Sequence, residues 1–188
     1  MARESHKAEI LEAALRLFVD KGVKAATTRE IAAQAGVSEG AIYRHFASKG
    51  ELAHVLFTSC AEQLLAWLRQ GVKEAVHPPD QLLAAVRAFF AFAHRKPLAY
   101  AYLMETHQRE FERLPKGREK PKDVFVDIIR RGIAQGYFRP LDANLAAALV
   151  IGMAIRTIFF LKQGLIEQPP EQVLTEVGRA ALRVLARE

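Results

Sequence analysis

The sequence predicts an all-α protein of about nine helices, and three observations support that fold class. Apolar residues recur at intervals of three and four along most of the chain, which is the spacing of one helix face. Proline, glycine and capping residues separate these periodic segments. No segment alternates apolar and polar residues over the length of a strand. The 188 residues can form a small domain joined to a larger one.

The first three predicted helices lie close together near the N-terminus. The first ends at Gly22, and these apolar residues share one of its faces: Ile10, Leu11, Ala14, Leu17 and Phe18. Thr27 and Glu30 have the spacing of a capping box, in which each side chain satisfies a free backbone donor of the other residue. They open a short second helix that ends at Gly36, and Ser38 is expected to cap the third.

Longer helices are expected over the rest of the chain. Ser48 and Glu51 repeat the capping-box spacing and open a helix that runs toward Lys73. Later helices are expected to begin close to Pro79, Pro97, Lys122, Asp142 and Pro170. Residues 145–161 are strongly apolar, but this stretch is shorter than the roughly 20 residues of a membrane span and contains Arg156. We therefore expect a buried helix there and no membrane contact.

Composition excludes several classes of function. The net charge of +6 only mildly favours an acidic partner, and the first 50 residues hold eight basic and six acidic side chains. Cys60 is the single cysteine, so an internal disulfide and a cysteine metal cage are excluded. The sequence contains no nucleophile elbow, metal-binding histidine pair or glycine-rich phosphate loop. We expect no catalysis, no metal and no cofactor, and the missing export signal favours a cytoplasmic protein.

Residues 27–52 have the layout of a helix-turn-helix. Gly36 supplies the left-handed backbone that ends one short helix, Val37 is an apolar plug, and Ser38 opens the next helix. Apolar and small residues on both helices can bury against each other: Ile31, Ala32, Ala35, Ile42 and Phe46. This motif presents its second helix to the major groove of DNA.

The same stretch resembles the DNA-binding region of the TetR family of transcriptional regulators. The resemblance covers nearly all of residues 8–54 and is carried by many positions at fixed spacing. The matching residues are Thr28, Ile31-Ala32, Ala35-Gly36-Val37-Ser38, Gly40, Tyr43, His45-Phe46 and Ser48-Lys49. It implies a helix-turn-helix DNA-binding domain over residues 1–50 and a helical ligand-binding and dimerisation domain over residues 51–188.

Roles for single residues follow from their chemistry and from this resemblance. Four side chains are expected to contact phosphates, which position the protein without reading sequence: Thr28, Tyr43, His45 and Lys49. Five residues are expected to meet base edges: Ser38, Glu39, Gly40, Ala41 and Arg44. Tyr43 can alternatively be a core residue, Arg44 a solvated or phosphate-only cation, and Glu39 an ordinary surface residue.

The resemblance also implies a homodimer formed through the last two helices, Asp142 to Gln163 and Pro170 to Arg187, and a palindromic operator in double-stranded DNA. Apolar residues on these helices exceed the expected need of one core: Val150, Ile151, Ala154, Ile158, Leu161, Val177, Ala181 and Leu185. The alternative is that they fill the core of a single chain. A repressor is the usual member of the family, although repression and activation are not distinguished by the residues.

The middle helices are expected to enclose a mostly apolar effector. The candidate lining residues are Trp67, Phe89, Phe90, Phe92, Tyr100, Met104, Phe125, Met153 and Arg156. Each apolar one can instead be core, and Arg156 can either anchor a carboxylate or extend to solvent. A basic loop can hold the phosphates of a fatty acyl-CoA: Arg109, Arg113, Lys116, Arg118, Lys120 and Lys122.

Three alternatives stay open at this point. A neutral aromatic drug or metabolite needs the pocket but not the basic loop. A helical ligand-binding protein or an enzyme without a DNA-binding role leaves the matched second helix of the motif unexplained.

Overall fold

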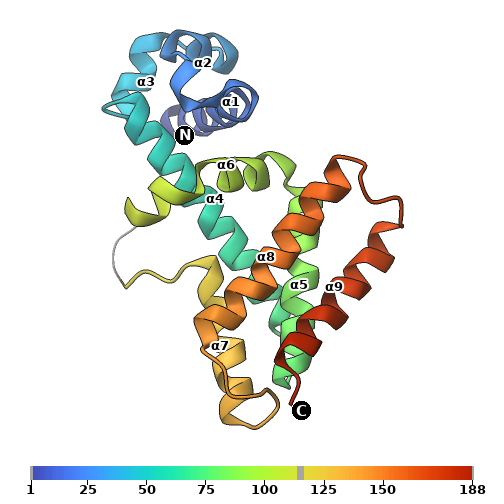
Figure 1. Ribbon diagram of the computed structural model, residues 1–188. Helices are drawn as coiled ribbons and strands as arrows, with labels where there is room; N and C mark the ends of the chain where they lie inside the picture. The colour runs from blue at the N-terminus through green and yellow to red at the C-terminus, as the bar shows by residue number, and fades with distance from the viewer. Residues whose placement is uncertain (1, 114–116, 188) are drawn as a thin grey trace. The chain divides into compact units, whose positions relative to one another are not determined.

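The computed structural model describes residues 2–113 and 117–187, with side chains described for residues 6–105, 110 and 117–187. This part of the chain contains nine helices and no strand, which confirms the predicted all-α fold. The helices are α1 (Ala2–Ala25), α2 (Thr28–Ala35), α3 (Glu39–His45), α4 (Lys49–Val72), α5 (Pro78–Arg95), α6 (Pro97–Arg113), α7 (Pro121–Ala134), α8 (Ala143–Lys162) and α9 (Pro170–Leu185) (Figure 1).

The chain forms two compact units. Residues 1–61 and 96–118 form the N-terminal unit, which contains α1, α2, α3, the first half of α4, and α6. Residues 62–95 and 119–188 form the C-terminal unit, which contains the rest of α4 together with α5, α7, α8 and α9.

The N-terminal unit is built around α1, which packs against α2, α3 and α6. Its largest fully buried side chains include Phe18, Phe46, Phe57 and Tyr102. The rings of Phe18 and Tyr102 stack with centroids 5.9 Å apart, and the Tyr102 hydroxyl donates a 3.0 Å hydrogen bond to the carbonyl of Ala53. Helix α6 is therefore attached to both α1 and α4 within this unit.

Local capping signals explain where the short helices begin and end. The predicted box at α2 is confirmed, because the Glu30 N–H donates to Thr27 Oγ1 at 3.2 Å and the Thr27 N–H donates to the Glu30 carboxylate at 2.9 Å. Hydrogen bonds from Lys21 and Thr27 lower the pKa of Glu30 to about 2. Gly36 ends α2 at φ +69°, a backbone conformation that favours glycine.

Three other predicted helix ends differ in detail. Gly22 breaks the helical backbone at φ +81°, as expected, but one more turn carries α1 to Ala25. Ser38 occupies the N-cap position of α3 without forming a side-chain cap hydrogen bond. At α4 the Glu51 N–H donates to Ser48 Oγ at 3.1 Å, whereas the Glu51 carboxylate accepts from the N–H of Ala47 rather than from Ser48. Ala47 lies just after the end of α3, and its exposed N–H is the donor that the Glu51 carboxylate satisfies.

The two N-caps allow a paired stability test. Thr27→Ala removes a cap hydrogen bond and is expected to lower the free energy of unfolding by about 1 kcal/mol, within a range of roughly 0.5–2. Ser38→Ala is expected to cost less, because no cap hydrogen bond is lost there. Urea unfolding followed by circular dichroism measures both. Equal losses of unfolding free energy in the two variants would contradict the assignment of a cap hydrogen bond to Thr27 and not to Ser38.

The C-terminal unit is organised around α5, which packs against α7, α8 and α9. Phe89 of α5 meets Phe125 of α7 edge to face with centroids 6.5 Å apart, and Phe92 meets Trp67 at 6.0 Å. Asp142 caps α8 by accepting a 2.8 Å hydrogen bond from the Leu145 N–H, as predicted. In Figure 1, α8 and α9 run next to each other in opposite directions, with α5 behind them.

Candidate functional site

Helix α3 presents one face to the core and the other to solvent. Ala41 and Ile42 are 3% and 0% exposed, and they hold α3 against the N-terminal unit. On the outer face Tyr43 is 52% exposed, and Arg44 is also exposed. Within the described part of the chain, the Arg44 guanidinium forms no hydrogen bond or ion pair, so its five donors are available to a partner.

Gly40 leaves the first turn of α3 open. A Cβ atom built at this position meets no other atom within 4 Å, and the residue is exposed. An incoming molecule can therefore approach the α3 backbone closely at this point. Ala41 was predicted to meet a base edge, but it is 3% exposed, because the buried side of α3 is wide enough to include both Ala41 and Ile42.

A polar cluster joins the start of α2 to α3. The Thr28 hydroxyl donates to the Glu39 carboxylate at 2.5 Å and lies 3.4 Å from the hydroxyl of Tyr43. Three of the predicted DNA-contact residues are thus brought together from positions up to 15 residues apart. His45, at the end of α3, is half-buried with its ring 6.2 Å from that of Phe46, and Ser38 is exposed.

Lys49 has a structural role that the sequence does not reveal. Its Nζ donates hydrogen bonds to the carbonyls of Lys24 at 3.0 Å and Ala26 at 2.6 Å. These bonds attach the first turn of α4 to the last turn of α1 and to the residue that follows α1. An ammonium group has three donors, so one remains for a partner such as a phosphate.

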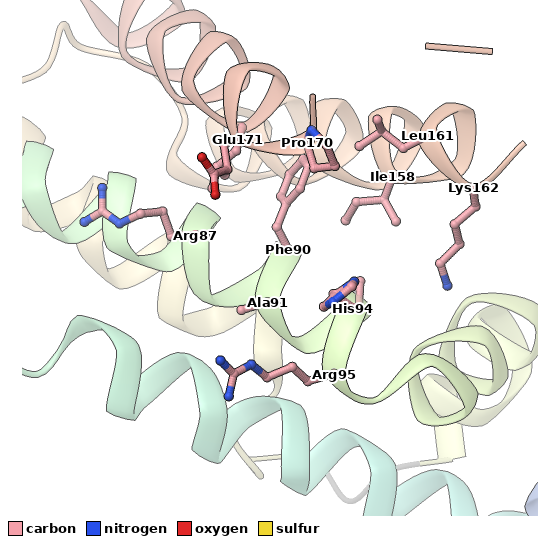
Figure 2. Close-up of a pocket in the computed structure, with 12 residues that line it drawn as sticks. Arg87, Phe90, Ala91, His94, Arg95, Ile158, Leu161, Lys162, Pro170 and Glu171 are labelled. Atoms are coloured by element: carbon pink, nitrogen blue, oxygen red, sulfur yellow. The ribbon is translucent and has the colours of Figure 1, made fainter. Parts of the chain in front are cut away.

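The C-terminal unit contains a pocket of about 530 Å³ between α5, α8 and α9. Its wall combines apolar side chains, among them Phe90, Ile158 and Leu174, with several charged ones (Figure 2). The charged and titratable lining residues are Arg87, His94, Arg95, Lys162 and Glu171. A pocket of this size accommodates one drug-sized molecule.

Only Phe90 of the predicted effector residues lines this pocket. Phe89, Phe92 and Phe125 are at most 4% exposed and form the core of the C-terminal unit. The half-buried Trp67 packs on Phe92. The remaining predicted residues lie elsewhere: Tyr100 and Met104 on α6 in the N-terminal unit, and Met153 and Arg156 on α8 outside the pocket wall.

None of the five charged or titratable pocket residues was predicted from the sequence: Arg87, His94, Arg95, Lys162 and Glu171. The available signal was the spacing of Arg87, Phe90, Ala91 and His94, which places them on one face of α5. That signal carries no information about which other helices face these residues, so the pocket becomes visible only in the folded unit.

Helix α8 is apolar on two sides, and only one side is covered. Its inner residues Val150, Ala154 and Ile158 are at most 4% exposed, whereas Leu145, Leu149 and Phe159 are 44–51% exposed. The prediction of a buried helix is therefore wrong for the single chain, because 28% of the most apolar stretch of α8 is buried. By length and composition alone α8 could cross a membrane, but a single such helix is weak evidence for a span.

Arg156 lies on this outer face of α8. Its guanidinium lies over the rings of Phe159 and Phe160, 4.9 Å from each centroid. Such stacking is favourable because the face of an aromatic ring carries negative charge density. The Arg156 guanidinium is thus positioned by two aromatic rings of α8 itself.

Comparison with known proteins identifies the family. A model of bacterial regulatory proteins of the tetR family matches residues 10–56, and a model of the tetracyclin repressor-like C-terminal domain matches residues 75–160. The transcriptional repressor KstR2 of Mycobacterium tuberculosis is 33% identical over 147 residues, which cover 75% of this chain and 74% of that protein. The chain belongs to the TetR family.

Two further TetR-type matches agree with this assignment. The transcriptional activator FasR of Mycolicibacterium smegmatis is 30% identical over 157 residues, covering 81% of this chain and 69% of that protein. The solved structure of the ketosteroid transcriptional regulator KstR2 of M. tuberculosis has a TM-score of 0.74 at 26% identity, covering 97% of this chain and 95% of that one. The predicted function of a DNA-binding transcriptional regulator is confirmed, and these relatives are regulators of transcription.

Membership of the TetR family allows a test of both roles of Lys49. Lys49→Ala is expected to lower the melting temperature of the free protein, because two carbonyls lose their donor. If the third donor contacts a phosphate, the slope of log affinity for DNA against log salt falls by about 0.9. Fluorescence anisotropy at several salt concentrations measures that slope. An unchanged slope with reduced thermal stability would leave Lys49 with the structural role only.

Proposed function

We propose that this TetR-family regulator is a cytoplasmic repressor that binds a palindromic operator as a homodimer and is released by a mostly apolar small molecule. The observation that carries the proposal is the outer face of α3. Arg44 is exposed there and has no partner in the described part of the chain, and the backbone at Gly40 is open to an incoming molecule. A helix-turn-helix places such a face in the major groove.

The contacts to DNA divide into two groups in this proposal. Arg44 reads a guanine through two parallel hydrogen bonds to its O6 and N7 atoms, and Ser38 contacts a neighbouring base. Thr28, Tyr43, His45 and Lys49 contact phosphates and so fix the position of α3. Glu39 reads a cytosine only after giving up its hydrogen bond with Thr28, so that bond is exchanged on binding.

The homodimer is proposed to form through the outer face of α8 together with α9. Positions 145, 149, 152, 156 and 159 alternate in steps of four and three, which is the spacing of a helix seam that packs on another helix. Gly152 in this seam has open space around its Cβ position, so a second helix can approach closely. A two-fold dimer presents two copies of α3, which accounts for a palindromic operator.

Release by the effector is proposed as a shift between two populations of the dimer. The effector binds the C-terminal unit and favours a spacing of the two α3 helices that no longer fits successive major-groove faces, about 34–36 Å apart. Reciprocity then requires that operator DNA weaken effector binding by the same factor. KstR2 of M. tuberculosis is a ketosteroid regulator, and the similarity of this chain to it supports an apolar effector by analogy.

The proposed effector is a lipid-like molecule, and fatty acyl-CoA is the candidate that the basic loop suggested. The side chains of Arg109, Arg113 and Lys116 lie outside the described residues. The predicted loop is shorter than expected, because Arg109 and Arg113 belong to α6 and Lys122 to the first turn of α7. Lys122 forms an ion pair with Asp123 at 2.8 Å, and Arg118 and Lys120 also interact within the chain. A neutral aromatic metabolite, which requires no cation, is the competing effector.

Direct binding measurements test the proposed function. The purified protein is titrated against DNA from upstream of its own coding region and against a shuffled sequence of equal composition. We expect at least about a thousandfold preference for an operator found in or near that region. Equal, salt-sensitive binding to every sequence would contradict an operator-specific repressor, and a reporter gene whose expression falls on deletion of the protein would indicate activation.

A further inference from the structure

The pocket between α5, α8 and α9 has an uneven distribution of charge. His94 and Lys162 lie toward one end of it, whereas Arg87 and Glu171 lie toward the other, and the Arg95 side chain starts at the His94 end and extends back along α5 (Figure 2). His94 is seven residues after Arg87, so the two ends are about 10 Å apart along the axis of α5. Among the described lining residues Glu171 is the one carboxylate, and it lies toward the Arg87 end.

The side chains at the His94 end can receive an anion. Neither His94 nor Arg95 forms a hydrogen bond or ion pair with any residue in the described part of the chain. Lys162 is exposed and already interacts within the chain, and partial desolvation of its ammonium lowers the pKa of that group. An anion bound beside His94 and Arg95 would receive charge-assisted hydrogen bonds from them, and the Lys162 ammonium adds another when it exchanges its present interaction.

Apolar side chains occupy the wall between the two charged ends. Phe90 and Ala91 come from α5, Ile158 and Leu161 from α8, and Leu174 from α9. This wall can bury an apolar body of roughly 10 Å length, with an anionic group at one end. Ile158 and Leu161 are not part of the Leu149 and Phe159 seam of α8, so ligand binding and dimerisation use different faces.

We propose that this pocket binds an apolar molecule with one anionic head group, a carboxylate or a phosphate, held by His94, Arg95 and Lys162. The inference rests on the proposed function in one respect, because this ligand is also the effector that releases the operator. It places the anion site at the end of α5 and α8, away from the basic loop before α7.

Matched probes test the head group. Dodecanoate and dodecyl phosphate carry the two candidate anions, and dodecanol has the same chain without charge. Binding is followed by calorimetry and by the fluorescence of Trp67, the single tryptophan, which contacts Phe92 on α5. We expect at least one anion to bind about tenfold or more tightly than dodecanol. The better anion identifies the head group.

Two cationic side chains of the pocket can be neutralised without altering the buried core. The double variant R95Q/K162Q is expected to lower affinity for the preferred anion about tenfold or more and to leave dodecanol affinity unchanged. Arg130→Gln, an exposed site on α7 outside the pocket, is the control and should change neither affinity. Circular dichroism confirms that all variants remain folded.

Several results would overturn the inference. These are equal binding of anions and dodecanol, unchanged anion affinity in R95Q/K162Q, or no binding of octanoate, dodecanoate, hexadecanoate or dodecyl phosphate. Operator binding without ligand is measured in parallel, so the two proposals can fail separately. Failure of every probe with intact operator binding rejects the anion site alone. Tight anion binding that leaves the operator complex intact rejects the release mechanism and keeps the site.

Discussion

The double variant L149E/F159E is expected to turn the dimer into a monomer at micromolar concentration. Both side chains are 44–45% exposed on the outer seam of α8, so the single chain does not need them for its core. In the dimer each would bury apolar area against the partner, and two carboxylates there would lose hydration that the one cation of this seam, Arg156, does not offset for both. We expect the dissociation constant to rise by about a thousandfold or more, which corresponds to roughly 4 kcal/mol.

Sedimentation equilibrium measures this change against the 21.0 kDa mass of one chain. Leu165→Glu is the control, since this residue is 64% exposed in the connection between α8 and α9. Operator affinity should fall with the dimer, because one helix-turn-helix contacts only one half-site. A variant that remains dimeric, or a monomeric wild-type protein, would exclude the α8 seam as the interface.

Charges at Ile158 or Val177 would test something different. The sequence suggested both residues as dimer contacts, but they are 4% and 8% exposed within the single chain. A glutamate at either position is expected to destabilise the C-terminal unit itself, because it buries an unpaired charge. Loss of the dimer in such a variant would follow from unfolding and would carry no information about the interface.

Arg44→Ala is expected to weaken operator binding by about 1–3 kcal/mol, or roughly 5- to 150-fold. The loss should be concentrated at one base-pair position of each half-site, because a bidentate contact distinguishes guanine from the other bases. The free protein should keep its stability, since Arg44 is exposed and forms no hydrogen bond or ion pair in the described part of the chain.

Anisotropy titrations against operators substituted at single positions measure the effect of Arg44→Ala. Arg16→Ala provides a matched control on α1, where the guanidinium pairs with Glu12 at 2.8 Å on an exposed surface. That variant should bind the operator as the wild type does. A loss of affinity in Arg44→Ala that is equal for all substituted operators would show that Arg44 contacts phosphate and does not read a base.

The local structure of the N-terminal region could be predicted because its determinants are close in sequence. The Thr27 and Glu30 capping box and the left-handed Gly36 each depend on residues at most three positions apart or on one backbone angle, and the Asp142 cap of α8 is equally local. The helix-turn-helix follows from such signals together with the apolar periodicity of its short helices. The outer face of α3 could therefore be predicted without any tertiary contact.

Contacts between distant residues could not be predicted in the same way. Lys49 donates to carbonyls 23 and 25 residues earlier, and Thr28 donates to Glu39 across the turn between two helices. Polarity alone identified these side chains as candidates for DNA contacts. Their bonds within the chain depend on how α1, α2, α3 and α4 pack, which no short-range pattern specifies.

The sequence by itself determined the all-α fold, the TetR-type helix-turn-helix and the presence of a large apolar C-terminal region. Only the tertiary structure decided which apolar residues form the core, which line the pocket and which remain for a partner. Phe89 and Phe90 are neighbours, yet Phe89 packs on Phe125 and Phe90 lines the pocket, because consecutive residues of a helix point about 100° apart. Hydrophobicity favours burial of both side chains without direction, and the arrangement of α5, α7, α8 and α9 decides where each is buried.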